Sequence, residues 1–178
     1  MDGVFLADLR SPDPRIAGIA ELGLPAVVIG HPSAAGPLTS VWSDDAAAVR
    51  DTLTYLTALG HRSVARVAGL PELNHTGLRD RAQREVCAEL GLGEPVIVHT
   101  DYSGEDGAHA TRRLISSPER PTAVIYDNDI MAVAGLSVAQ EMGLDVPGDL
   151  SLVTDGAADG FEDAAARLVP RGSTAAPR

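Results

Sequence analysis

The sequence contains no lysine, and all 14 of its basic residues are arginines. With 25 acidic residues, the formal net charge is −11. This balance argues against binding DNA or an anionic membrane through this chain alone, because phosphate recognition requires a basic face. The single cysteine, Cys87, excludes an internal disulfide and a cysteine-based zinc site. It falls within a helical pattern, and we expect it to be a small core residue.

Aromatic residues make up only 3% of the chain, so its core is predicted to be aliphatic. No apolar stretch approaches the roughly 18 residues that span a bilayer. The first residues, MDGVFLADLR, carry acids and lack the basic region of a secretory signal. We therefore expect a cytoplasmic protein without a membrane partner.

Short apolar runs alternate regularly with amphipathic helical patterns. The predicted strands cover 3–7, 25–30, 38–42, 64–68, 95–99, 123–126 and 150–153, and helices lie between most of them. This alternation predicts an α/β fold with an open parallel sheet and helices on both faces. A chain of 178 residues is too short for a complete (β/α)8 barrel, which needs about 250.

The most informative stretch is 121–135, where a short buried strand is followed by Asp127, Asn128 and Asp129 and then by a helix. Polar side chains in this position lie at the carboxyl end of a sheet, where open α/β folds bind ligands. Asn128 can donate and accept hydrogen bonds. The alternative is that these residues only cap the helix. Asn128 and Asp129 are both candidates for effector binding, and we expect Asp129 to be the cap and Asn128 to face the ligand.

Other local signals organise the rest of the chain. The Pro/Gly/Ser-rich residues 31–43 are interpreted as a crossing between two lobes, and Thr76 is predicted to cap a helix over 77–90. His61 is expected to pack and hydrogen-bond after a helix end. We expect a remnant of an N-terminal lobe over 1–42, a C-terminal lobe over 43–155, and an irregular or disordered tail over 156–178.

Several segments together resemble the effector-binding domain of LacI/GalR-type transcriptional regulators, which is similar to type I periplasmic binding proteins. The resemblance is carried by residues 1–32, 43–69 with LGHR, 102–114, 120–135 with NDIMA, and 146–153 with VPGD. It covers about residues 1–153 and implies mostly the C-terminal lobe of that domain.

The resemblance implies an effector held between two lobes, a sugar or similar small polar molecule. It implies that Arg79 and Asn128 contact the ligand and that His75 and Thr76 line the cleft. Asp155 is displaced by one position from an acidic residue that contacts the ligand in the family. For Arg79 the alternative is a solvated helix residue. A homodimer is implied, as is DNA binding through a helix-turn-helix that this sequence does not contain. We expect the chain to be truncated at both ends.

Two other functions compete with a sensor. A transport-type solute-binding protein would share the fold but needs an export signal. A small α/β enzyme is the other, and its Mg²⁺ could be held by Asp44 and Asp45 with Asp127–Asp129. A phosphotransfer receiver would also need a lysine, and the GxGxxG, GxxxxGK[ST], GxSxG, HExxH and CxxC motifs do not occur. We therefore predict no enzymatic activity, no cofactor and no bound metal.

Overall fold

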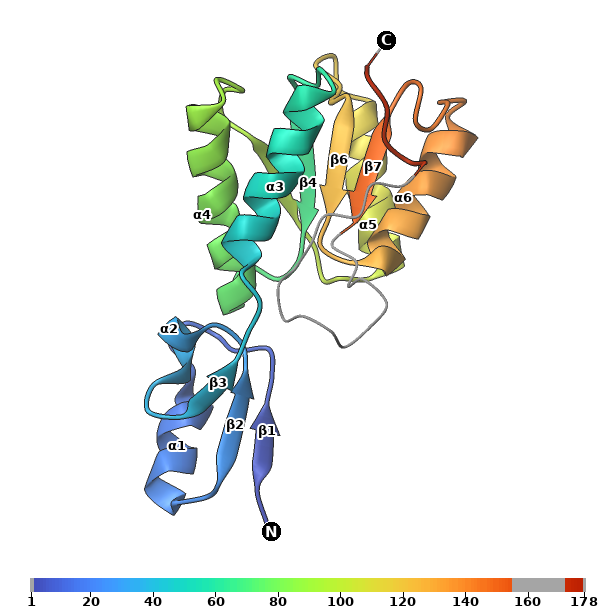
Figure 1. The fold of residues 1–178 in the computed structure, drawn as a ribbon. Coiled ribbons are helices and arrows are strands. Elements are labelled where there is room, and N and C mark those ends of the chain that lie inside the picture. Colours follow the sequence, from blue (N-terminus) through green and yellow to red (C-terminus); the bar gives the residue numbers. More distant parts are fainter. Residues whose placement is uncertain (1, 155–171, 178) are drawn as a thin grey trace.

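The computed structural model describes residues 2–154 and 172–177, which form two lobes (Figure 1). The smaller lobe, residues 2–42, contains a sheet of order β1-β2-β3. Its strands are β1 (Val4–Leu6), β2 (Ala26–Ile29) and β3 (Thr39–Val41). The larger lobe, residues 43–154 with 172–177, has a sheet of order β5-β4-β6-β7. Its strands are β4 (Val64–Ala68), β5 (Val96–His99), β6 (Ala123–Tyr126) and β7 (Ser151–Thr154).

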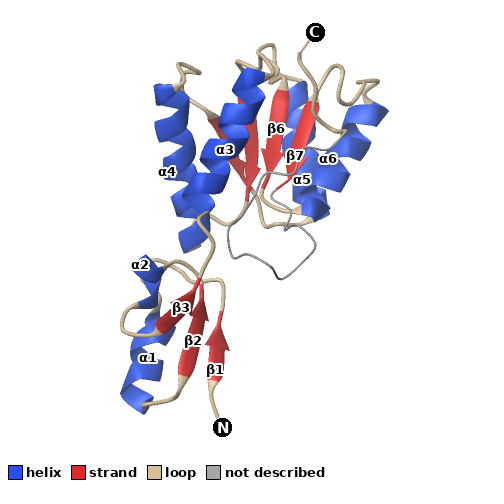
Figure 2. Ribbon diagram, viewed as in Figure 1, coloured by secondary structure: helices blue, strands red, loops and turns tan. Residues whose placement is uncertain are grey.

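Every strand pair in both sheets is parallel, which confirms the predicted α/β class. The helices of the smaller lobe are α1 (Pro14–Leu22) and α2 (Pro32–Ala35). Those of the larger lobe are α3 (Asp45–Ala58), α4 (Asn74–Glu89), α5 (Gly104–Ile115) and α6 (Asp129–Glu141). Figure 2 shows that α3 and α4 lie together on one side of the larger sheet and α5 and α6 on the other. Parallel strands need such crossover helices, which bury both faces.

The two faces of the larger sheet bury separate aliphatic cores. Leu53 and Leu56 of α3 and Val86 of α4 pack on one face together with Cys87, as expected for a core cysteine. On the other face, buried residues of α5 and α6 surround Tyr126. The prediction of helices on both faces is therefore confirmed for this lobe.

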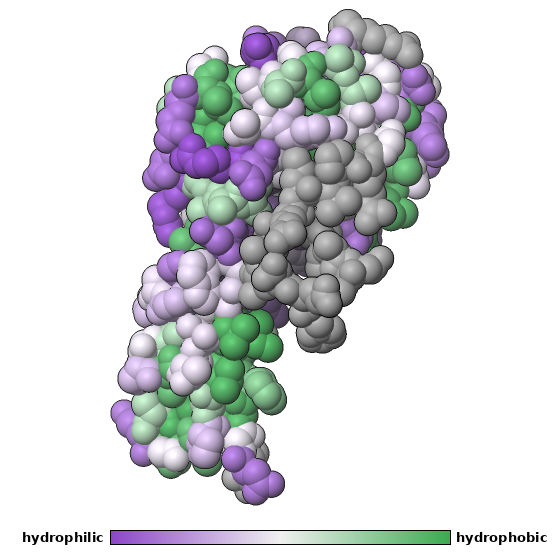
Figure 3. Space-filling model, in the orientation of Figure 1, coloured by the Kyte–Doolittle hydropathy of each residue, from purple (hydrophilic) through white to green (hydrophobic). Residues whose placement is uncertain are grey.

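The smaller sheet is covered differently. Its inner face buries Leu6 and Val28 against Ile16 of α1. On the opposite face Phe5, Ile29 and Val41 are exposed, and hydrophobic residues gather on this lobe in Figure 3. Among the described residues, no helix lies over that face.

Two local predictions are corrected. Residues 31–43 are more than a crossing, since they contain α2, which was not predicted, in addition to β3, which falls within the strand predicted over 38–42. Thr76 does not cap α4, because the helix already begins at Asn74 and Thr76 is buried in its first turn. A tertiary contact explains the earlier start: the backbone N–H of Asn74 donates to the carbonyl of Leu9 in the smaller lobe, at 2.7 Å. This satisfies a helix-end donor without a side-chain cap.

The described part of the tail, 172–177, has no helix or strand but lies along β7. The N–H of Leu152 donates to the carbonyl of Ser173 at 2.9 Å. His61 is buried and bonds Thr122 through Nδ1 and the carbonyl of Ala175 through Nε2, both at 2.8 Å. This confirms the packing and hydrogen-bonding role predicted for His61. Among the described helices, none is long and apolar enough to cross a membrane.

Candidate ligand-binding cleft

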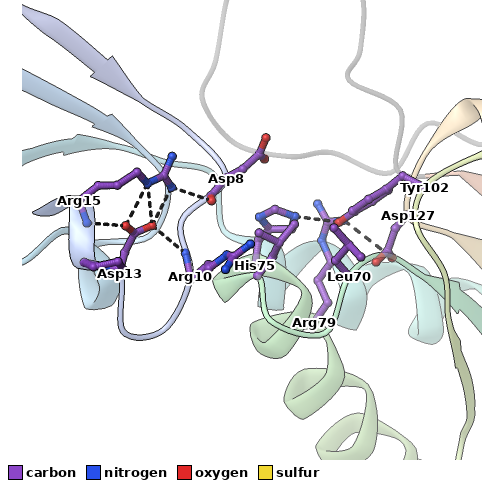
Figure 4. A pocket seen from close by; sticks show the side chains of 11 residues that line it. Asp8, Arg10, Asp13, Arg15, Leu70, His75, Arg79, Tyr102 and Asp127 are labelled. Atoms are coloured by element: carbon purple, nitrogen blue, oxygen red, sulfur yellow. Dashed lines mark hydrogen bonds and ion pairs between the residues drawn. The ribbon is translucent and has the colours of Figure 1, made fainter.

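A cleft of about 670 Å³ lies between the lobes (Figure 4). The smaller lobe contributes Asp8, Arg10, Asp13, Pro14 and Arg15, and the larger lobe contributes Leu70, Leu73, His75, Arg79, Tyr102 and Asp127. The lobes also touch directly where the backbones of Arg10 and Leu73 form an antiparallel bridge. A molecule in this cleft would therefore contact both lobes at once.

On the smaller lobe, an ion pair fixes the loop that follows β1. Asp13 caps α1 by accepting a hydrogen bond from the N–H of Arg15, and the two side chains approach to 2.6 Å. Arg15 also donates to the carbonyls of Ala7 and Asp8. The Arg15 guanidinium holds the pKa of the Asp13 carboxyl well below its usual range. Asp13 is therefore ionised across the physiological pH range.

On the larger lobe, Asp127 directly follows β6 and lies at the floor of the cleft. Its carboxylate is almost fully buried and accepts a hydrogen bond from the N–H of Gly69 at 3.0 Å. Arg66 pairs with it at 2.9 Å, and Arg79 approaches it to 3.8 Å. Arg79 is held from its other side by Asp45, at 2.8 Å. The guanidinium of Arg79 is thus positioned by carboxylates, which rules out the alternative of a simply solvated residue.

His75 and Tyr102 form a second polar group on the cleft wall. The hydroxyl of Tyr102 lies 2.8 Å from Nε2 of His75 and 3.3 Å from Oγ1 of Thr76. Burial, with a contribution from the nearby Arg79 charge, lowers the pKa of His75, so its imidazole is neutral at pH 7. Burial raises the pKa of Tyr102, which keeps its hydroxyl protonated. The pair offers a ligand neutral donors and acceptors.

The structure gives the cap of α6 to Asn128 rather than to Asp129. Asn128 is the N-cap of α6: its Oδ1 accepts from the N–H of Met131 at 2.8 Å, and its Nδ2 donates to the carbonyl of Tyr102. Asp129 is exposed and accepts from the hydroxyl of Thr154 at 2.6 Å. The backbone of Asn128 is extended, as an N-cap requires, whereas Asp129 is already helical. Neither belongs to the described lining of the cleft, although Asn128 supports Tyr102.

The other predicted site residues are placed as follows. His75 and Arg79 line the cleft, and Thr76 lies behind them, bonded to Tyr102. Asp155 lies outside the described residues. A magnesium site at Asp44, Asp45 and Asp127–Asp129 gains no support, because within the described ranges no three acidic, histidine or cysteine side chains cluster as metal ligands do.

Several cleft residues were missed from the sequence. Asp8, Arg10 and Arg15 lie around the start of α1, where the sequence gives only a helix-start signal. Arg66, which lies outside the cleft lining but contacts Asp127, carried a usable signal, because it is the one charged residue in the otherwise apolar strand VARVA. Asp127 and Tyr102 each follow a strand of the larger sheet at its carboxyl edge, which is the general position of ligand sites in such folds.

The chain matches known proteins over most of its length. Residues 53–177 match the family model described as a periplasmic binding protein-like domain. The HTH-type transcriptional repressor PurR of Escherichia coli is 34% identical over 161 residues, which cover 86% of this chain and 46% of PurR. The chain thus spans about half the length of this curated relative.

Solved structures give the same result. A LacI family transcriptional regulator from Bifidobacterium animalis superposes with a TM-score of 0.83 at 43% identity, covering 89% of this chain and 58% of that one. The transcriptional regulator CelR, in complex with cellobiose, superposes with a TM-score of 0.75 at 27% identity, covering 86% and 48%. These relatives are regulators rather than enzymes, in agreement with the prediction. The chain belongs to the periplasmic binding protein-like family and corresponds to the effector-binding domain of LacI-type transcriptional regulators.

Proposed function

We propose that the cleft between the lobes binds a sugar or a similar small polar effector. The observation that carries this proposal is the lining itself, which combines oriented hydrogen-bonding groups from both lobes with the ring of Tyr102. Vicinal hydroxyls suit the forked donors of arginine and the paired acceptors of carboxylates. The likeness to CelR, solved with cellobiose, supports a carbohydrate.

The charges of the lining favour an uncharged ligand. The cleft presents three carboxylates and three guanidiniums, namely Asp8, Asp13, Asp127, Arg10, Arg15 and Arg79. The fixed pairs Asp13–Arg15 and Asp45–Arg79 satisfy much of this charge within the protein. A strongly charged ligand would have to displace such pairs, whereas a polyhydroxylated one can add hydrogen bonds to them.

Binding would act on the relative position of the lobes. A ligand that contacts both lobes stabilises the arrangement in which both sets of contacts are made, and so shifts the population toward it. We propose that this shift serves a cytoplasmic, dimeric regulator whose DNA contacts come from a helix-turn-helix outside this sequence. The transport-type and enzymatic alternatives have no specific observation in their favour.

Thermal unfolding with a panel of sugars and nucleosides tests the proposal. An effector that binds only the native state must raise the midpoint temperature. We expect Arg79→Ala to abolish that rise, because Arg79 lines the cleft, and Arg81→Ala to preserve it, because Arg81 is exposed on the same helix. Cellobiose is the first probe.

Two results would contradict the proposal. One is that none of the compounds shifts the transition of a cooperatively folded chain. The other is a shift that Arg79→Ala and Arg81→Ala reduce equally, which would locate binding outside the cleft.

A further inference from the structure

We infer that Arg66 is a positioning residue for the cleft: it fixes the carboxylate of Asp127 and, through it, the Gly69 backbone and the guanidinium of Arg79. The inference rests on the proposed function in treating the cleft as a ligand site. Arg66 itself does not line the cleft but lies beneath its floor, in the middle of β4.

The guanidinium of Arg66 contacts both oxygens of Asp127. Nε lies 2.9 Å from Oδ1 as an ion-pair contact, without forming a hydrogen bond, and Nη2 donates to Oδ2 at 3.3 Å. Nη2 also donates to Asp80 at 2.9 Å, and Nη1 donates to Gln83 at 3.3 Å. The side chain is 1% exposed, so the protein supplies the partners of its two terminal nitrogens, while Nε has the Asp127 charge beside it but no hydrogen bond. A planar fork held at several points defines the orientation of what it binds.

This ion pair belongs to a network of side chains of alternating charge along the carboxyl edge of the larger sheet. It runs through Asp45, Arg79, Asp127, Arg66 and Asp80. At its far end Asp80 meets Nε2 of His99, at 3.0 Å. The residues come from α3, α4, β4 and the segment after β6, so the ion-pair network connects four parts of the lobe at the cleft floor.

Stability alone gives a weak reason for such an arginine. Removing two opposite charges from water costs about as much as their pairing returns, and replacing buried ion pairs with apolar residues is often neutral or stabilising. The neighbouring positions in β4 are Ala65 and Val67, which are buried as an apolar strand requires. A buried arginine in this strand is better explained by the geometry that it imposes on Asp127.

The consequence reaches the cleft through Gly69. Asp127 accepts the hydrogen bond from the Gly69 N–H, and the ring of Tyr102 lies so close to Gly69 that an added Cβ would be 1.8 Å from its Cζ. Gly69 therefore contacts both Asp127 and Tyr102. If Arg66 releases Asp127, the Gly69 N–H loses its fixed acceptor directly beside the Tyr102 ring that lines the cleft.

Amide hydrogen exchange followed by NMR tests this without any ligand. The protection of the Gly69 amide is compared with that of Leu56, a fully buried residue of α3 that reports global opening. In Arg66→Met we expect Gly69 protection to fall about tenfold more than that of Leu56, which corresponds to one lost hydrogen bond. Asp127→Asn serves as the reference for a weakened acceptor. Arg84→Met makes the same substitution at an exposed arginine of α4 and is the matched control. It should leave the ratio of Gly69 protection to Leu56 protection unchanged.

Arg66→Lys keeps the inference testable if the methionine variant does not fold. An ammonium can pair with Asp127 but cannot grip both of its oxygens while also reaching Asp80, so an intermediate loss at Gly69 is expected. The inference is overturned if Gly69 keeps its protection relative to Leu56 in the variants that fold. A uniform loss at Gly69 and Leu56 would show a merely structural arginine. Because this measurement needs no effector, a failure of the inference can be distinguished from a failure of the proposed function.

Discussion

Arg79 and Arg81 are two residues apart on α4, yet one faces the cleft and the other faces solvent. A step of two residues along a helix turns the side chain by about 200°, so neighbouring positions of identical chemistry have different surroundings. Arg79 meets Asp45 from α3 and Asp127 from the end of β6. At this scale, the role of an ionised residue depends on which partners the fold brings to it.

Tyr126 shows the same dependence for a neutral residue. It is fully buried, and its hydroxyl lies 2.9 Å from the hydroxyl of Thr111. Burial raises its pKa to about 12. In the unfolded chain a tyrosine ionises near pH 10. The folded state therefore binds the proton of Tyr126 more tightly than the unfolded chain does. The stability that Tyr126 contributes in this way is fully present below pH 10 and is lost as the pH rises toward 12.

We predict that Tyr126→Phe removes this alkaline loss. In the wild type, the raised pKa of Tyr126 adds about 3 kcal/mol to the free energy of unfolding below pH 10, and this contribution is lost as the pH rises to 12. At pH 7 the variant loses one hydrogen bond, which costs about 1 kcal/mol. Urea unfolding at pH 7, 10 and 11.5 measures both effects. Parallel pH slopes in the two proteins would show that Tyr126 is not the responsible group.

At the scale of elements, short-range signals were reliable. Asp13, Asp44 and Ser103 each cap the helix that directly follows them in the sequence, because a cap bonds an N–H only two or three residues away. The apolar runs of β4 and β6 were located to the residue, since a strand buried on both faces reads as a continuous apolar segment.

Long-range contacts explain the failures at this scale. The start of α4 is set by Leu9, more than sixty positions away, and could not be seen in the local pattern around Thr76. The choice of Asn128 rather than Asp129 as the cap has a similar origin. Asn128 bonds the Tyr102 carbonyl and Asp129 bonds Thr154, so tertiary partners decide between two adjacent residues that are both good caps.

The segment 172–177 is predicted to stabilise the larger lobe. It occupies the edge of β7 and supplies the acceptor for the buried Nε2 of His61. Removing residues 172–178 should therefore lower stability by about 1–3 kcal/mol, the usual cost of a buried polar group without a partner. It should also increase aggregation, because an open strand edge pairs with other chains.

Chemical denaturation and light scattering measure these two effects. Removal of Arg178 alone leaves 172–177 intact and is the control. Equal stability of both shortened chains would contradict a role for the segment.

At the scale of the whole molecule, the two lobes are joined by a small set of contacts. At the joint the Asn74 N–H donates to the carbonyl of Leu9, and its Nδ2 donates to the hydroxyl of Ser11 at 2.6 Å. Both bonds begin at the first residue of α4. The lobes are thus coupled at the base of the cleft, where a change in their relative position would alter the contacts of a bound ligand.

We predict that Asn74→Pro uncouples the lobes without harming α4. Proline is well tolerated at the first position of a helix, and Leu73 already has the extended backbone that a following proline requires. The substitution removes both interlobe bonds, whereas Asn74→Ala removes only the side-chain bond.

Trp42, whose ring meets that of His31 in the smaller lobe, serves as a fluorescent reporter, and circular dichroism follows the helices of the larger lobe. The two thermal transitions should separate in the proline variant and remain closer in the alanine variant. Coincident transitions in both variants would show that these bonds do not couple the lobes.

The sequence by itself determined the α/β class, the order and approximate limits of most elements, the aliphatic core and the resemblance to LacI-type effector domains. These follow from periodicity, capping residues and motifs, which act over a few positions along the chain. The tertiary structure decided the division into two sheets, the start of α4 and the composition of the cleft. Arg79, Tyr102 and Asp127 come together there from three separate segments. Ionised groups are organised by partners in space, and only folding brings those partners within bonding distance.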